Sequence, residues 1–136
     1  MRWFGLRIYS ATLWSEHSPF NENAPFALEL IYHHQIKHER IVETSIAEIK
    51  RLFGQRFSAD KLQKWETLMS QAFPDVADGD QLIGIFIPQQ GCRFYDRVGL
   101  RATINDPEFA EAFFAIWLDP RSKDSSLREH LLGITK

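Results

Sequence analysis

Two arginines, a tyrosine and a serine near the start of the chain have the chemistry to hold an anionic ligand. Residues 3–14 alternate in the manner of a β-strand, in which successive side chains point to opposite faces. Arg7 and Tyr9 fall on one face beside small residues, and Arg2 and Ser10 fall on the other beside apolar ones. An arginine next to a hydroxyl on an apolar floor can bind a carboxylate or an enolate, because the guanidinium stays charged and donates in a fork. The residues by themselves favour a plainer interpretation, in which the arginines reach water and the tyrosine packs.

The histidines and the single cysteine form no recognisable catalytic or metal-binding motif. His33, His34 and His38 are close in sequence, but there is no CxxC, no HExxH and no carboxylate at matching spacing. We therefore expect solvated histidines and predict no metal site and no cofactor. Cys92 has a positive neighbour in Arg93 but no base, so we expect a small buried apolar residue rather than a nucleophile.

Composition indicates one ordinary globular domain spanning residues 1–136. Eleven Phe and four Trp predict a bulky core or an apolar cavity. Sixteen basic residues face eighteen acidic ones without a basic stripe, which argues against nucleic-acid binding. No run approaches the roughly 20 apolar residues of a membrane span. The start of the chain lacks the pattern of a signal peptide, and the compartment stays open: periplasmic if a leader was removed, otherwise cytoplasmic.

Hydrophobic periodicity predicts an α+β fold in which helices cover an antiparallel sheet, in the order ββααβββαα. Gly54 is placed to end the first helix, Ser58 to cap the second, and Asp106-Pro107 to begin the third. The third helix is apolar nearly all round and is therefore expected to be buried. The pattern predicts strands at about 3–14, 26–32, 81–87, 92–97 and 100–104, and helices at about 38–53, 58–73, 108–118 and 127–132.

Four stretches together resemble a known family. They are GLRIYSATLW (5–14), PFALEL (25–30), FAEAFFAIWLDP (109–120) and SLREHLLG (126–133). The chain is similar to the bacterial chalcone-isomerase-like proteins, a branch of the chalcone isomerase superfamily, over nearly its whole length. The resemblance implies an open-faced β-sandwich with a cleft between sheet and helices. Plant members close a ring in chalcones with the help of an Arg and hydroxyl groups, and other members bind fatty acids through an Arg and a Tyr.

Only part of the family's site carries over to this sequence. The strand hydroxyl falls at Ser10, the neighbouring aromatic position at Tyr9, and Arg2 is the nearest candidate for the upstream arginine. The hydroxyl of the late helix falls at Ala110, which cannot hydrogen-bond. The catalytic tyrosine falls among residues 36–38, where no Tyr stands. One missing donor can cost roughly 3 kcal/mol of transition-state stabilisation, so true chalcone isomerase activity is not expected.

The leading hypothesis is a domain with little or no catalytic activity that binds a small apolar molecule, such as a fatty or aromatic acid, in the cleft. Arg2, Tyr9 and Ser10 would make the polar contacts, with Arg7 as the rival cation. One alternative is an isomerase or intramolecular lyase acting on an enone-like substrate, with His38 as the nearest acid–base group. Another is an interaction protein whose cleft is filled by its own bulky residues, Trp14, Phe113, Phe114 and Trp117.

Overall fold

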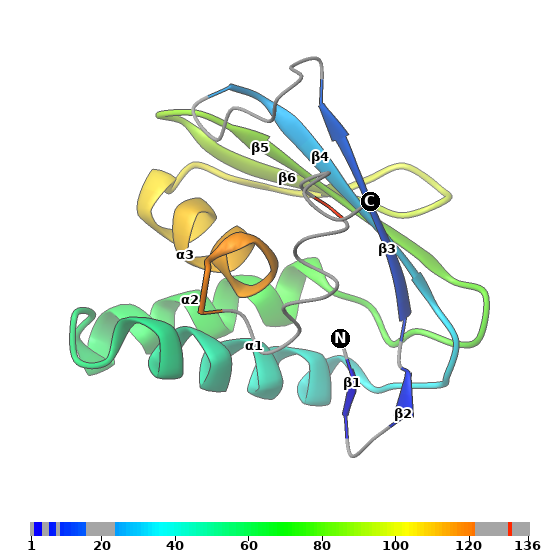
Figure 1. The fold of residues 1–136 in the computed structure, drawn as a ribbon, viewed down its shortest axis with the longest axis horizontal. Coiled ribbons are helices and arrows are strands. Elements are labelled where there is room, and N and C mark those ends of the chain that lie inside the picture. The colour runs from blue at the N-terminus through cyan, green and yellow to red at the C-terminus, as the bar shows by residue number, and fades with distance from the viewer. Residues whose placement is uncertain (1, 4–5, 8, 16–23, 122–130, 132–136) are drawn as a thin grey trace.

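A five-stranded antiparallel sheet forms one layer of the protein, and its strands lie side by side in chain order (Figure 1). The computed structural model describes the chain except residues 1, 4–5, 8, 16–23, 122–130 and 132–136. The sheet comprises β3 (Tyr9–Ser15), β4 (Phe26–Tyr32), β5 (Gln81–Ile87), β6 (Gly91–Tyr95) and β7 (Leu100–Ile104). Every neighbouring pair is antiparallel, and for β5–β6 and β6–β7 the short polar turns predicted this.

Three helices form the second layer, and Figure 1 shows all of them on one side of the sheet. They are α1 (His38–Phe53), α2 (Ala59–Ala72) and α3 (Pro107–Leu118). The predicted boundaries are confirmed, since α1 ends at Gly54 and the Ser58 hydroxyl accepts the Lys61 N–H at 3.1 Å. The Asp106 carboxylate likewise accepts the Phe109 N–H at 3.1 Å. The fold class is therefore the predicted α+β. The predicted last helix lies outside the described residues, apart from Leu131.

The first predicted strand is not continuous, which corrects the sequence interpretation. Before β3, the backbone forms a separate antiparallel pair of β1 (Arg2–Trp3) and β2 (Leu6–Arg7), in which Arg2 lies opposite Arg7. The chain therefore reverses between Trp3 and Leu6. Alternation of side chains along a segment indicates which face of the sheet each residue lies on. It does not indicate whether the segment forms one strand or a hairpin. Gly5 was the available signal, because glycine favours the two-residue turns of hairpins.

Among the described residues, the buried side chains of the sheet lie mainly on its helical side. On β3, Tyr9 is buried while Ser10, Thr12 and Trp14 are exposed, as the alternation of a half-covered strand requires. Trp14 is 60% exposed, so the hypothesis that it fills the cleft is wrong for this residue. The helix α3 lies in the core, as its composition predicted; its buried residues are Phe109, Ala110, Ala112, Phe113, Phe114, Ile116 and Trp117.

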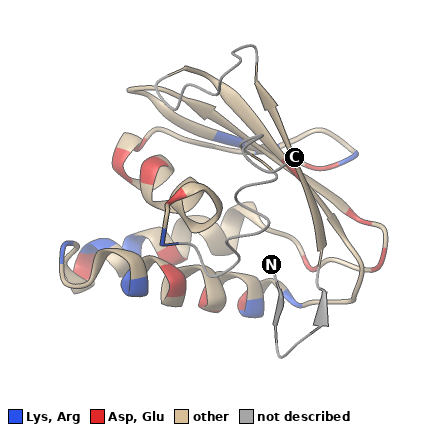
Figure 2. Ribbon diagram, in the orientation of Figure 1, with Lys and Arg blue, Asp and Glu red and all other residues tan. Residues whose placement is uncertain are grey.

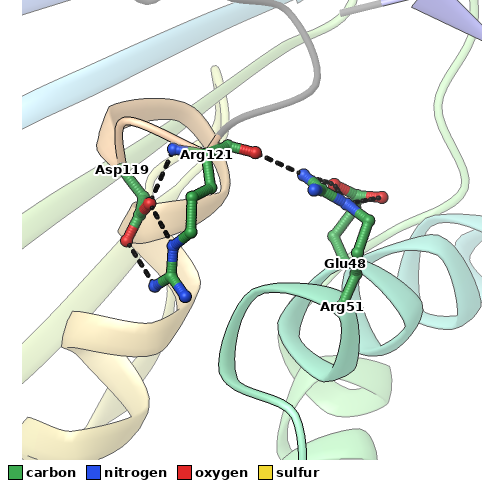
Figure 3. Close-up of polar contacts among 4 residues, drawn as sticks. All are labelled: Glu48, Arg51, Asp119 and Arg121. Carbon is green, nitrogen blue, oxygen red and sulfur yellow. Dashed lines mark hydrogen bonds and ion pairs between the residues drawn. The ribbon is translucent and has the colours of Figure 1, made fainter.

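Charged groups hold the ends of α1 and α3 together. In Figure 3, Arg51 lies against the buried carboxylate of Glu48 and donates to the backbone carbonyl of Arg121 at 2.8 Å. Arg121 in turn forms a bidentate ion pair with Asp119, in which Nε and Nη2 of the arginine donate to the two carboxylate oxygens at 2.9 and 3.0 Å. Figure 2 shows acidic and basic residues interspersed along the helices rather than gathered in one block. No helix in the described part of the chain has the length and apolar character to span a bilayer.

The turn between β6 and β7 predicts a pH dependence of stability. Asp96 accepts the Val98 N–H at 2.8 Å and the Gly99 N–H at 3.1 Å, and it pairs with Arg101 at 3.1 Å. These contacts, the Val98 N–H above all, lower the pKa of Asp96 below its usual value. β6 ends at Tyr95, directly before this residue and two residues before the predicted end.

Because the folded pKa of Asp96 is the lower one, its stabilisation is present above the unfolded pKa of about 4 and is lost as pH falls through the folded pKa. We expect Asp96→Asn to unfold at a lower temperature than the native protein at pH 7, and the difference to shrink below about pH 4. Thermal unfolding of both proteins at pH 7, 5 and 3 measures this. A difference that stays constant down to pH 3 would contradict it.

Candidate functional site

A cavity lies between the sheet and the helices α1 and α3, where the resemblance predicted a cleft. Its volume is about 20 Å³, measured as the space open to the centre of a water molecule, which is room for about one water. Aromatic and aliphatic side chains form most of its wall. The lining residues are Tyr9, Leu30, Tyr32, Ile41, Thr44, Ser45, Phe73, Leu82, Phe113, Ile116 and Trp117.

Tyr9 supplies one polar group of the cavity. It is buried on the first strand of the sheet, where its hydroxyl accepts a hydrogen bond from the Trp117 indole N–H of α3. Its ring meets Tyr32 edge to face, with the centroids 5.6 Å apart. Tyr9 is therefore on the core side of the sheet, and the bond to Trp117 joins this strand to α3.

Tyr32 supplies another polar group, besides the Thr44 and Ser45 side chains that also line the cavity, and sequence analysis missed it. It is 3% exposed, and burial raises the pKa of its phenol, so the hydroxyl stays protonated at neutral pH. Within the described residues no side chain or backbone group hydrogen-bonds this hydroxyl, although the backbone of Tyr32 pairs with Asp80 and Gly79. Because Tyr32 lines the cavity, its hydroxyl is a donor that a molecule in the cavity can reach. The sequence did carry a signal for its burial, because Tyr32 is the last inward-facing position of the alternating segment 26–32.

The four predicted ligand-binding residues do not all meet at the cavity. Ser10 is exposed on the opposite face of β3, where its hydroxyl lies 2.7 Å from His33 Nε2. Adjacent strand positions face opposite sides, so Tyr9 and Ser10 cannot both line the same cavity. Arg2 and Arg7 are paired across the β1–β2 hairpin, and their side chains lie outside the described part. Because the hairpin comes just before Tyr9 in the chain, both arginines remain candidates for ligand binding.

The groups needed for catalysis are not gathered around the cavity among the described residues. Ala110 is fully buried and offers no hydroxyl. His38, the acid–base candidate, begins α1 and is hydrogen-bonded to the Asp75 side chain. It is not part of the cavity wall. Cys92 is buried, and burial raises the pKa of its thiol to about 12 with a smaller effect of Asp106, which confirms the apolar interpretation.

The five-stranded antiparallel sheet, helices on one of its faces and an aromatic cavity between the layers define an open-faced α+β sandwich. The sequence matches the chalcone isomerase-like family over residues 4–133, so the chain belongs to that family. The structure is similar to the crystal structure of a fatty-acid binding protein from Arabidopsis thaliana, with a TM-score of 0.63 and 11% identity. The match covers 82% of this chain and 56% of that one, and at this identity it shows the fold alone. No curated protein matches the sequence.

Proposed function

We propose that this chalcone isomerase-like domain binds a small, largely apolar molecule, such as a fatty or aromatic acid, between the sheet and α1 and α3, and does not isomerise chalcones. The observation that carries the proposal is the Tyr32 hydroxyl, which has no hydrogen-bond partner among the described residues, at an apolar cavity that occupies the place of the family's cleft. An oxygen atom on the ligand would accept from Tyr32, and its apolar part would pack against residues such as Phe73, Phe113 and Ile116.

The cation for an acidic ligand is proposed to be Arg2 or Arg7. A carboxylate buried without a positive partner is unfavourable, and an arginine is the residue that best offsets this cost. The neighbouring hairpin carries both arginines, and the fatty-acid binding protein of the same fold is named for a ligand of this class. Ser10 is left out, because it faces the other side of the sheet.

The water-sized cavity sets a condition on this function. A fatty acid occupies far more than the 20 Å³ that the described residues leave open, so its binding requires side chains of α1 or α3 to move. The same volume favours a second candidate function, an interaction domain whose cleft is filled by its own aromatic residues. In that case Phe113 and Trp117 are permanent core residues, and no ligand enters.

Binding of a fluorescent fatty acid to the purified protein distinguishes the two functions. We expect saturable binding that weakens about fivefold in Tyr32→Phe, because one hydrogen bond contributes about 1 kcal/mol. Tyr95→Phe is the matched control, since Tyr95 lies on the outer face of β6, and it should bind like the native protein. Replacement of both Arg2 and Arg7 by Ala should abolish binding of the acid.

Each result of this experiment has a clear meaning. Saturable binding in the native protein with unchanged affinity after both arginine replacements would overturn the carboxylate part of the proposal. No binding to the native protein, together with native mass spectra free of any bound acid, would instead support the filled cleft.

A further inference from the structure

A histidine and two carboxylates come together at the start of α1, apart from the cavity wall. His38 Nδ1 lies 2.8 Å from Asp75 Oδ1 and 3.0 Å from Glu39 Oε1. One ligand atom from each residue lies within 4.8 Å of the other two. Ligand atoms around a tetrahedral Zn²⁺ with bonds of about 2.0–2.2 Å are roughly 3.3 Å apart, so only small shifts would bring all three into contact with one ion.

Backbone contacts that do not depend on any ion hold these residues in place. Asp75 Oδ1 accepts the backbone N–H of His38 at 2.8 Å. One residue beyond Asp75 and two before His38, Val76 and Ile36 exchange a pair of backbone hydrogen bonds of 2.9 and 2.8 Å. The segment that follows α2 is thereby fixed against the start of α1. A site of this kind is assembled by the fold before a ligand arrives, which lowers the cost of binding.

The charges and exposure suit a divalent cation. Glu39 and Asp75 are exposed and His38 is partly exposed, so an ion reaches them directly from water. Two carboxylates offset the charge of the ion, and an imidazole nitrogen favours Zn²⁺ over Mg²⁺ or Ca²⁺, which prefer oxygen ligands.

We propose that His38, Glu39 and Asp75 form a binding site for a divalent transition-metal ion, with Zn²⁺ as the best match to one nitrogen and two oxygen ligands. Water would complete the coordination. The ion would tie the start of α1 to the segment that precedes β5. The sequence prediction of no metal site considered spacing along the chain, whereas Asp75 reaches His38 from 37 residues away.

Calorimetric titration of ZnSO₄ into the untagged protein at pH 7 tests this site. We expect saturable binding of one ion per chain and a rise in the unfolding temperature with Zn²⁺ concentration. His38→Ala should weaken binding by at least about tenfold, a loss that even a supporting residue of a metal site can cause. His34→Ala is the matched control, because His34 is exposed in the same segment and is not part of the cluster.

A second variant covers the case in which His38→Ala is unstable. Asp75→Asn keeps an oxygen that can accept the His38 N–H but removes the negative charge, so it should fold and still weaken Zn²⁺ binding. Absence of saturable binding to the native protein would overturn the proposal. Equal affinity in native protein, His38→Ala and Asp75→Asn would overturn it too, and loss of binding in His34→Ala alone would place the ion elsewhere.

Discussion

Replacement of Gly91 by alanine is expected to destabilise the protein by more than about 4 kcal/mol, or to prevent folding. Gly91 begins β6 with a φ of 144°, and a Cβ atom there would lie 1.9 Å from the backbone carbonyl oxygen of Ile104. The same Cβ would meet the backbone nitrogen of Asp106 at 2.9 Å. Backbone atoms cannot turn aside as a side chain does, so the end of β7 and the start of α3 would have to shift.

Gly99→Ala is the matched control for this replacement. Gly99 has nearly the same φ, 150°, but nothing lies within 4 Å of the position its Cβ would take. Its alanine variant bears only the backbone strain, roughly 1–3 kcal/mol. Urea unfolding of the two variants, with soluble yield as a second measure, separates strain from steric overlap. Equal losses in Gly91→Ala and Gly99→Ala would show that the overlap with Ile104 is unimportant.

Replacement of Trp65 by alanine is expected to cost about 3–5 kcal/mol of unfolding free energy, the usual loss for a large buried aromatic residue. Trp65 is fully buried on α2, with its ring 4.7 Å from Phe57 and 5.6 Å from Phe109 by centroid distance. Its indole N–H also donates to Asp106 Oδ2 at 3.0 Å. Asp106 caps α3 through its other oxygen, so the loss of Trp65 disturbs the capping group as well.

Two further tryptophan variants show which part of this effect is cavity formation. Trp14→Ala should change the unfolding free energy by no more than about 0.5 kcal/mol, because Trp14 is 60% exposed. Trp65→Phe fills most of the space but leaves Asp106 without its donor, and should cost about 1–3 kcal/mol. Denaturant unfolding followed by circular dichroism measures all three. A loss under 1 kcal/mol in Trp65→Ala would refute the central packing role of this residue.

The candidate site was only partly predictable, and Ser10 and Tyr32 show why. A family resemblance assigns site residues by their position in the sequence. It therefore assigned Ser10 and Tyr9 to the same site and expected the catalytic tyrosine at residues 36–38. The pleat turns Ser10 away from the cavity, and the second tyrosine of the cavity is Tyr32, four residues earlier than that window. The interior position of Tyr32 followed from strand alternation, but the groups that lie near its hydroxyl depend on how α1 and α3 pack against the sheet.

The sequence alone determined the local structure, because the interactions involved are local. Helix ends follow from the capping groups Ser58 and Asp106 within three residues of their partners, and the inward face of each strand follows from alternation. Only the tertiary structure decided the size of the cavity and the approach of Asp75 to His38. These are contacts between segments or volumes left over after packing, and no short-range pattern in the sequence encodes them.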